Sequence, residues 1–559
     1  MSSVYSQSPP VSEIDDFGWN TIQDRLRDSV VAIKSNTAFY FDTEMPGNST
    51  STGFVVDSEH GLIVSSRHVM ETGPVSHKAV FANDIEVPLQ PFFYDPVHDF
   101  SIFRYNPAEL KSFKPTEIPL CPEEAYSGME FRIVSNDSCE ILSVHGGELS
   151  QLHRNPPDYQ SGYVDYNCFY MQASTSAGSG SSGSPVVNID GKAVAMMAGR
   201  KSNSSSSYFV TLHRLVYALE YVGQGEVPPR GTLQAIFVHV ASSEAQRLGL
   251  TEELAIEQGV DVEATEGFLK VDSILTSGPA DGKLKIGDII LSINEYPING
   301  FLELSEIVDA SVGNDVTINI FRDDQFLNVD VSVQDMYSLI PTKLLRVGGA
   351  YIHDMSFHLA AETPTPISGV KGMGVSDLNL KNIDNAEKLG EGAQVLILSQ
   401  GNYGNFEVYT SPIICRGIGC SNDCSCCANP KYYNFENYAL DNMPNVYPDN
   451  INGSPAVPET AYIKYYVTEI NRTPVNTLDD VVRVVKQLKS PGLRDFNQAV
   501  ANNQHLASGA MPGYDVKIRT VSFTGSESLA TIRTNDHYFP AWQASRGPSL
   551  DDTWKIEFL

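Results

Sequence analysis

Apolar residues in the first part of the chain recur in short alternating runs, separated by turns rich in Gly and Pro. A period of two residues is typical of β-strands with one buried face. A helical pattern flanks this region on each side, over Asn20–Val31 and over Leu212–Tyr221, and Gly223 ends the second helix. The pattern therefore predicts a mainly β domain over residues 18–225.

Changes in composition mark the other parts of the chain. Residues 1–17 are polar and acidic and contain two adjacent prolines, which predicts a disordered N-terminus. A linker rich in Gly and Pro leads into residues 230–337, where strand patterns return. Residues 345–545 carry weaker strand signals and a polar insertion at about 400–460. We therefore expect three domains after the N-terminal segment.

One segment rich in Gly and Ser, Gly178–Pro185, directly precedes the apolar pair Val186–Val187. Such strings are common in flexible linkers. Glycines also allow tight turns in which main-chain N–H groups converge on the oxygen of a tetrahedral intermediate. A serine in such a turn is a candidate nucleophile, and we assign this role to Ser182.

Two residues upstream favour the catalytic interpretation. His68 follows the apolar strand 61–64, and Asp99 precedes another alternating strand. The order His, Asp, Ser is that of the chymotrypsin triad, in which the Ser attacks, the His transfers its proton and the Asp orients the His. Asp95, which directly precedes a proline, is the alternative orienting residue.

The chemistry of such a triad needs no metal and no organic cofactor, and we expect neither. The oxyanion that forms during attack requires converging N–H donors next to the nucleophile. The expected donors of this oxyanion hole are the main-chain N–H groups of Gly180, Ser181 and Ser182.

Charge and hydropathy narrow the range of binding partners that we expect. The chain has 559 residues and a net charge of −30, from 38 basic and 68 acidic side chains. Nucleic-acid binding needs a basic face, so we expect no nucleic-acid partner. No run approaches the ~20 apolar residues of a membrane-spanning helix. The N-terminus also lacks the layout of a signal peptide, so we expect no membrane association and a location in the nucleus and/or cytoplasm.

The first 225 residues resemble the protease domain of HtrA/Deg-type serine proteases, on the segments Arg67–Val69, Asp95–Phe100 and Gly180–Gly191. The similarity is closest to the fungal nuclear, pro-apoptotic HtrA-like proteases, which carry two protease-like halves; this chain resembles one half. It implies a chymotrypsin-like double β-barrel followed by two PDZ-like domains. It also implies an ATP-independent endopeptidase that cleaves misfolded or regulatory proteins and assembles as a homo-oligomer, a trimer by this resemblance.

The chain departs from the wider family next to the nucleophile. Most HtrA proteases have Asn before the catalytic serine and two glycines after it, whereas this chain has Ser181 and, at the second glycine, Ser184. The fungal branch tolerates this pattern, so we expect an active site. The departure leaves a second function open, a peptide-binding chaperone or scaffold whose protease head is inactive or locked.

Residues 230–337 resemble a PDZ domain, on the turn Gly287–Asp288, the alternating strand after it and the helix Leu302–Asp309. A PDZ domain adds a peptide as an extra strand and binds its carboxylate with main-chain N–H groups. Protein or peptide substrates are therefore the expected partners. The resemblance places the carboxylate loop at Gly231, Thr232 and Leu233.

Residues 345–545 resemble a second PDZ domain that the insertion at about 400–460 interrupts. Five cysteines crowd into this insertion. Four thiolates would hold a structural zinc ion, but the spacing is not that of paired Cys-x2-Cys knuckles, and a surface loop without metal is the alternative. The candidate ligands are Cys415, Cys420, Cys424, Cys426 and Cys427.

Overall fold

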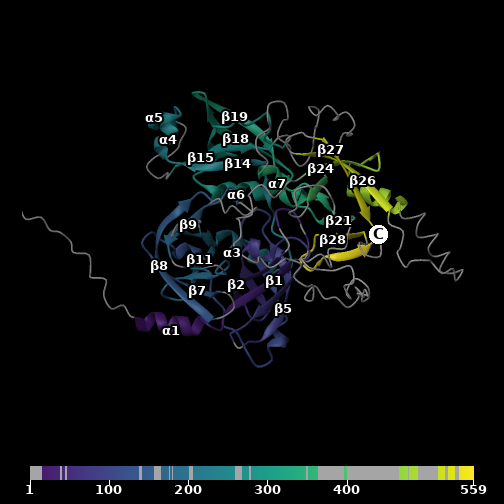
Figure 1. Cartoon of the computed structure of the whole chain (residues 1–559). Coiled ribbons are helices and arrows are strands. Elements are labelled where there is room, and N and C mark those ends of the chain that lie inside the picture. The colour runs from purple at the N-terminus through teal and green to yellow at the C-terminus, as the bar shows by residue number, and fades with distance from the viewer. Residues whose placement is uncertain are drawn as a thin grey trace, which may run out of the picture. The chain divides into compact units, whose positions relative to one another are not determined.

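The computed structural model of the chain describes residues 16–559 with gaps, of which the longest are 157–164, 258–266, 363–395, 400–464 and 489–513. The described part is mainly β (Figure 1). It contains two closed six-stranded barrels and two open sheets, one of six and one of nine strands. The predicted double β-barrel is therefore confirmed. Residues 1–15 and the cysteine cluster lie outside the described residues, so the predictions for them stay predictions.

The first barrel closes around aliphatic and aromatic side chains, among them Ile33, Ile63 and Phe103, all fully buried. Apolar positions alternate along the strands and so point into the core, whereas in the third strand every side chain is buried. In spatial order its strands are β1 (Val30–Thr37), β2 (Gly47–Asp57), β3 (Leu62–Ser65), β6 (Ser101–Arg104), β5 (Glu86–Tyr94) and β4 (Val75–Val80).

The second barrel packs around Phe131 and Phe209, whose rings meet edge to face with centroids 5.4 Å apart. Apolar side chains from four further strands complete this core. In spatial order its strands are β10 (Pro185–Val187), β11 (Ala193–Arg200), β12 (Ser206–Thr211), β9 (Tyr170–Ser174), β8 (Ile141–Arg154) and β7 (Glu130–Asp137).

Two helices flank the barrels, as predicted, but the first differs in its bounds. It is α1 (Asp16–Leu26), and Val30 and Val31 belong instead to β1. The two valines are fully buried in the barrel, and β-branched residues favour a pleated strand, so strand pairing overrides the helical period here. The second helix, α3 (His213–Val222), lies within one residue of its predicted span. The shorter helices are α2 (Arg67–Met70), η1 (Pro107–Leu110) and η2 (Pro122–Glu124).

The first open sheet carries the predicted turn Gly287–Asp288, and Gly287 adopts a φ of +96° that favours glycine. Asp288 is buried and forms a bidentate ion pair with Arg322, with Nε–Oδ1 at 2.6 Å. In order its strands are β14 (Ala235–Val240), β15 (Phe268–Ile274), β16 (Ile289–Ile293), β18 (Asp315–Arg322) and β19 (Gln325–Ser332), with β17 (Tyr296–Pro297) on β16. Around it lie α4 (Ser242–Arg247), α5 (Glu252–Glu257), α6 (Phe301–Ala310), η3 (Met336–Leu339) and the paired strands β13 (Gly231–Thr232) and β20 (Gln334–Asp335).

The second open sheet lies in the region for which a second PDZ domain is predicted. Its core includes Val467 and Ile470 of one strand and apolar residues of the helix 478–488, close to the predicted helix 477–488. In order its strands are β27 (Glu527–Thr534), β26 (Tyr514–Ser522), β24 (Tyr465–Ile470), β23 (Leu396–Ser399), β22 (Ala350–Asp354), β21 (Lys343–Val347), β28 (Trp542–Ser545) and β29 (Lys555–Phe558), with β25 (Thr473–Pro474) on β24 and the helix α7 (Phe357–Glu362) after β22.

The residues group into two compact units whose bounds do not simply follow the sequence. The first unit holds both barrels, and the second holds both open sheets together with the short segments 37–47 and 72–74. Within the second unit, Phe39 packs edge-on against Trp542 with centroids 4.8 Å apart, and Phe41 against Trp554 at 5.2 Å. Apolar aromatic contacts therefore bind these segments to the C-terminal sheet.

Candidate active site

Strand pairing brings His68 and Asp99 together. β3 and β6 pair with Ser65 opposite Ser101, so the residues just after β3 and just before β6 lie at the same end of the barrel. The Ser101 hydroxyl strengthens this junction, since it lies 3.2 Å from the carbonyl oxygen of Ser65 and 2.9 Å from that of Ser66. His68 stands on the single turn α2 that follows.

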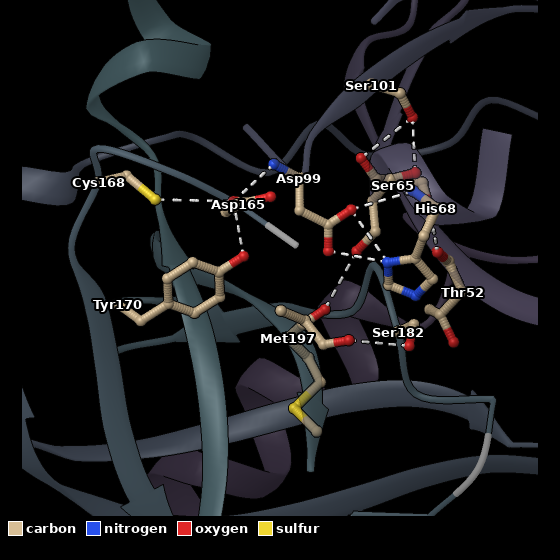
Figure 2. A network of polar contacts seen from close by, with 12 residues as sticks. Thr52, Ser65, His68, Asp99, Ser101, Asp165, Cys168, Tyr170, Ser182 and Met197 are labelled. Carbon is tan, nitrogen blue, oxygen red and sulfur yellow. Dashed lines mark hydrogen bonds and ion pairs between the residues drawn. The ribbon is translucent and has the colours of Figure 1, made fainter. Parts of the chain in front are cut away.

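Asp99 holds the His68 ring by its Nδ1 atom (Figure 2). Nδ1 lies 2.8 Å from Oδ2 and 3.0 Å from Oδ1 of Asp99, and the His68 main-chain N–H donates to Oδ1 at 3.0 Å. The Asp99 side chain is fully buried, whereas 36% of the His68 side chain is exposed. This contact leaves Nε2 of the ring free of Asp99 and available for proton transfer.

The alternative orienting residue has another role. Asp95 accepts hydrogen bonds from the main-chain N–H groups of Val97 at 2.9 Å and His98 at 2.7 Å. These contacts close a local turn of the type that Asp side chains favour. The structure therefore brings Asp99 to His68 and uses Asp95 to shape the loop before it.

Electrostatics set the basicity of His68. Burial alone would lower its pKa, but the charge of Asp99 and its hydrogen bond raise it, Asp165 raises it further, and Arg67 opposes them. The result is a His68 pKa above the ordinary value of 6.5. His77, buried in the same barrel with the Ser35 hydroxyl at its Nδ1, shows the opposite effect, since burial lowers its pKa to about 3.

Thr52 of β2 holds the loop that carries Ser182. Its N–H donates to the Ser182 carbonyl at 3.0 Å, and its hydroxyl donates to the Gly180 carbonyl at 2.8 Å. The next N–H, that of Gly183, donates to Met197 at 2.7 Å. Among the described residues, the N–H groups of Gly180 and Ser182 donate no hydrogen bond. These two donors therefore remain available to a ligand.

The three predicted oxyanion donors are not equivalent in this loop. Ser181 places its N–H 3.4 Å and its hydroxyl 2.6 Å from the carbonyl oxygen of Gly178. Gly180 adopts a φ of +96°, which glycine tolerates without strain. The loop thus occupies the Ser181 N–H internally and leaves those of Gly180 and Ser182.

The Ser182 hydroxyl donates to the carbonyl oxygen of Ala198 on β11, at 3.0 Å. Within the described part of the chain, no hydrogen bond joins Ser182 to His68. Catalytic hydrogen bonds are often absent or long before substrate binds. A rotation of the Ser182 side chain away from Ala198 would therefore be needed to complete a triad.

The predicted carboxylate loop precedes β14 of the first open sheet, and its first two residues form β13, which pairs with β20. The Gly231 N–H donates to Asp309 of α6 at 2.9 Å, and the Leu233 carbonyl accepts from Ala280 at 3.3 Å. Leu233 is buried, and the next residue, Gln234, adopts a positive φ of 53°. The N–H of Gly231 thus already has an acceptor within the domain.

Metal binding has one geometric candidate among the described residues. The ligand atoms of Cys121, Glu123 and Glu124 lie within 4.8 Å of one another. Glu124 is already engaged, since it accepts from Asn188 at 2.6 Å and pairs with the Lys192 ammonium. We therefore assign no metal to this group.

Thr52 and Asp165 are functional candidates that the sequence analysis missed. Thr52 stands in an ordinary strand before Gly53, and Asp165 stands in an aromatic-rich segment before β9. Neither position carries a motif by itself. Only contacts across large sequence separations reveal them.

Comparison with known proteins agrees with this geometry. The sequence matches the trypsin-like peptidase domain family over residues 51–196 and the PDZ domain family over residues 258–333. It is 41% identical over 354 residues to Protease Do-like 7 of Arabidopsis thaliana, a match that covers 61% of this chain and 32% of that protein. The chain is thus similar in sequence to known proteases.

Further relatives extend the comparison. The Pro-apoptotic serine protease NMA111 of Yarrowia lipolytica is 40% identical over 354 residues, which cover 63% of this chain and 36% of that protein. The chain thus spans about a third of the length of these relatives. A solved structure of the HtrA-type protease AlgW with tripeptide aligns with a TM-score of 0.43 and 19% identity, over 56% of this chain and 96% of the other. No helix among the described residues is long and apolar enough to cross a membrane.

Gly183 gives a direct test of the loop geometry. Its φ is +84°, and a Cβ atom there would lie 2.1 Å from the Thr52 carbonyl oxygen and 2.2 Å from the Ser65 hydroxyl. We expect Gly183→Ala to lower the free energy of unfolding, measured by urea denaturation, by more than the ~1–2 kcal/mol of left-handed strain alone. Gly128→Ala is the matched control, since its φ is +85° and no atom lies within 4 Å. Equal losses in both variants would contradict the close approach.

Proposed function

We propose that this chain is an ATP-independent serine endopeptidase of the HtrA type that cleaves misfolded or regulatory proteins. The observation that carries the proposal is the His68–Asp99 pair, with its short Nδ1 contact, in a double barrel whose Ser182 loop leaves main-chain donors unused. The serine protease relatives support the same chemistry.

The proposed mechanism assigns each group one task. Ser182 attacks the scissile carbonyl after its hydroxyl turns from Ala198 to Nε2 of His68. His68 accepts the proton and later donates it to the leaving amine, while Asp99 fixes the ring and stabilises its charged form. The N–H groups of Gly180 and Ser182 bind the oxyanion, and loss of one such donor typically costs roughly 3 kcal/mol of transition-state stabilisation.

One observation favours the alternative, a peptide-binding chaperone or scaffold with a locked protease head. The Ser182 hydroxyl bonds to Ala198 and not to His68. Covalent labelling separates the two functions, because a fluorophosphonate reacts only with an activated serine.

We also propose that the PDZ domain binds an extended peptide along β14. This strand is the first in the order of its sheet, where it pairs with β15, and a PDZ ligand adds as a further strand at such an edge. The carboxylate would lie at the loop before β14, whose predicted residues are Gly231, Thr232 and Leu233.

Location and assembly complete the proposal. We place the protein in the nucleus and/or cytoplasm, as the sequence predicts. The pro-apoptotic names of the fungal relatives support a regulatory role. A homotrimer stays a prediction from the resemblance.

Removal of the nucleophile or the base should abolish catalysis. We expect Ser182→Ala and His68→Ala to lose fluorophosphonate labelling and at least ~10⁴-fold in casein cleavage, since triad members act as a unit. Ser127→Ala, at an exposed serine, should behave as the wild type. A wild-type chain that binds casein without cleavage or labelling would favour the scaffold function. Labelling that persists in Ser182→Ala would place the nucleophile elsewhere.

The pH dependence follows from the raised pKa of His68. General-base catalysis needs the neutral imidazole, and a raised pKa keeps the ring protonated up to a higher pH. We therefore expect the acid limb of kcat/KM to have its midpoint above pH 6.5, the ordinary histidine value. Stopped assays with a neutral peptide substrate across pH 5–9 would measure it, and a midpoint below that value would contradict the assigned electrostatics.

Peptide binding tests the PDZ proposal separately. With Ser182→Ala to prevent cleavage, we expect fluorescent peptides with an apolar C-terminal residue to bind, and the C-terminal amide of the same peptide to bind at least about tenfold more weakly, because a charge-assisted contact is lost. Fluorescence anisotropy would measure both. Equal affinity for acid and amide would exclude a carboxylate loop.

A further inference from the structure

A second buried carboxylate lies behind the His68–Asp99 pair. Asp165 precedes β9 of the second barrel, and only 2% of the residue is exposed. Three donors point at its Oδ2 atom (Figure 2). They are the main-chain N–H of Asp99 at 2.9 Å, the Tyr170 hydroxyl at 2.7 Å and the Cys168 thiol at 3.7 Å.

The contact with Asp99 ties the two barrels together at the proposed active site. Asp99 belongs to the loop before β6 of the first barrel, whereas Asp165 and Tyr170 belong to the second. Asp99 thus has its main chain held by Asp165 and its side chain held on His68. A shift of the Asp99 main chain would move the carboxylate that orients the imidazole.

Asp165 also adds charge behind the catalytic histidine. Two acidic groups act on His68: Asp99 through direct contact and Asp165 from the other side of Asp99, and both raise the His68 pKa. Arg67, next to His68 in the chain, lowers it. A fixed negative charge stabilises a nearby imidazolium most where water is excluded, and both Asp99 and Asp165 are buried.

We propose that Asp165 is a positioning residue of the protease: its carboxylate anchors the Asp99 main chain from the second barrel and supports the imidazolium that forms on His68. This inference rests on the proposed function. Asp165 itself touches neither substrate nor the reacting atoms, and it acts through Asp99 and by its charge.

Two substitutions separate the effect of the Asp165 hydrogen bonds from the effect of its negative charge. Asp165→Asn keeps an acceptor for Asp99 and Tyr170 but removes the charge. Asp165→Ala removes both. We expect Asn to shift the acid limb of kcat/KM to lower pH with a modest loss of kcat, and Ala to reduce kcat by a further factor of about 10², as for a misplaced catalytic group, with KM little changed. Asp190→Asn, at an exposed carboxylate of the same barrel, is the matched control.

The readouts distinguish a positioning role from a structural one. Rates are normalised to the folded fraction from thermal unfolding, and retention of most kcat by Asn but not Ala counts as rescue. If both variants match the wild type in kcat and pH profile, the proposal is overturned. If Asp165→Ala does not fold, the proposal is decided by whether Asp165→Asn shifts the acid limb of kcat/KM to lower pH.

A measurement that does not need catalysis tests the role of Asp165 even if the proposed protease function is wrong. The His68 imidazole is titrated by NMR in Ser182→Ala, with His68→Gln to assign its signal among the 12 histidines. We expect Asp165→Asn to lower the His68 pKa in this inactive background. A wild-type chain without cleavage would overturn the protease function alone, whereas an unchanged His68 titration would overturn the role of Asp165.

Discussion

Thr52 is the residue on which the geometry of the nucleophile loop depends. Its N–H and hydroxyl hold the carbonyl oxygens of Ser182 and Gly180, and its own carbonyl accepts from the Ser65 hydroxyl at 2.7 Å. Because both loop carbonyls turn toward Thr52, the N–H groups of Gly180 and Ser182 are left for a ligand. The same closeness demands glycine at position 183, where any side chain would meet the Thr52 carbonyl.

The sequence predicts those parts of the site that follow from local pattern. His68 and Asp99 stand next to apolar strands, and the glycines around Ser182 mark a tight turn, so residue type and spacing suffice. Thr52 and Asp165 could not be predicted, because their roles depend on contacts with residues that are distant in the sequence. Thr52 and Gly180 are 128 positions apart, and Asp165 and Asp99 are 66 positions apart. The predicted helix through Val31 fails for a related reason, since pairing and burial in the barrel decide the conformation of β1.

The bounds of the second unit could not be predicted from local sequence pattern either. Its members include segment 37–47, between β1 and β2, and segment 72–74, just after α2. Within this unit the Trp554 indole donates to the Thr72 carbonyl at 3.1 Å, and Glu44 accepts from the Thr72 N–H at 2.6 Å. A boundary drawn by composition at residue 230 cannot capture such pieces, because aromatic packing and a hydrogen bond join residues more than 400 positions apart.

The position of the Ser182 hydroxyl determines what must change before the proposed triad is complete. Turning from Ala198 to His68 exchanges one hydrogen bond for another, and the net worth of each is about 1 kcal/mol. The two arrangements are therefore close in energy, and the raised pKa of His68 makes its neutral form a better acceptor. A substrate carbonyl that engages the N–H groups of Gly180 and Ser182 would place its carbon beside the hydroxyl. In the proposed mechanism, binding of substrate and not a large rearrangement of either barrel would thus select the reactive side-chain position.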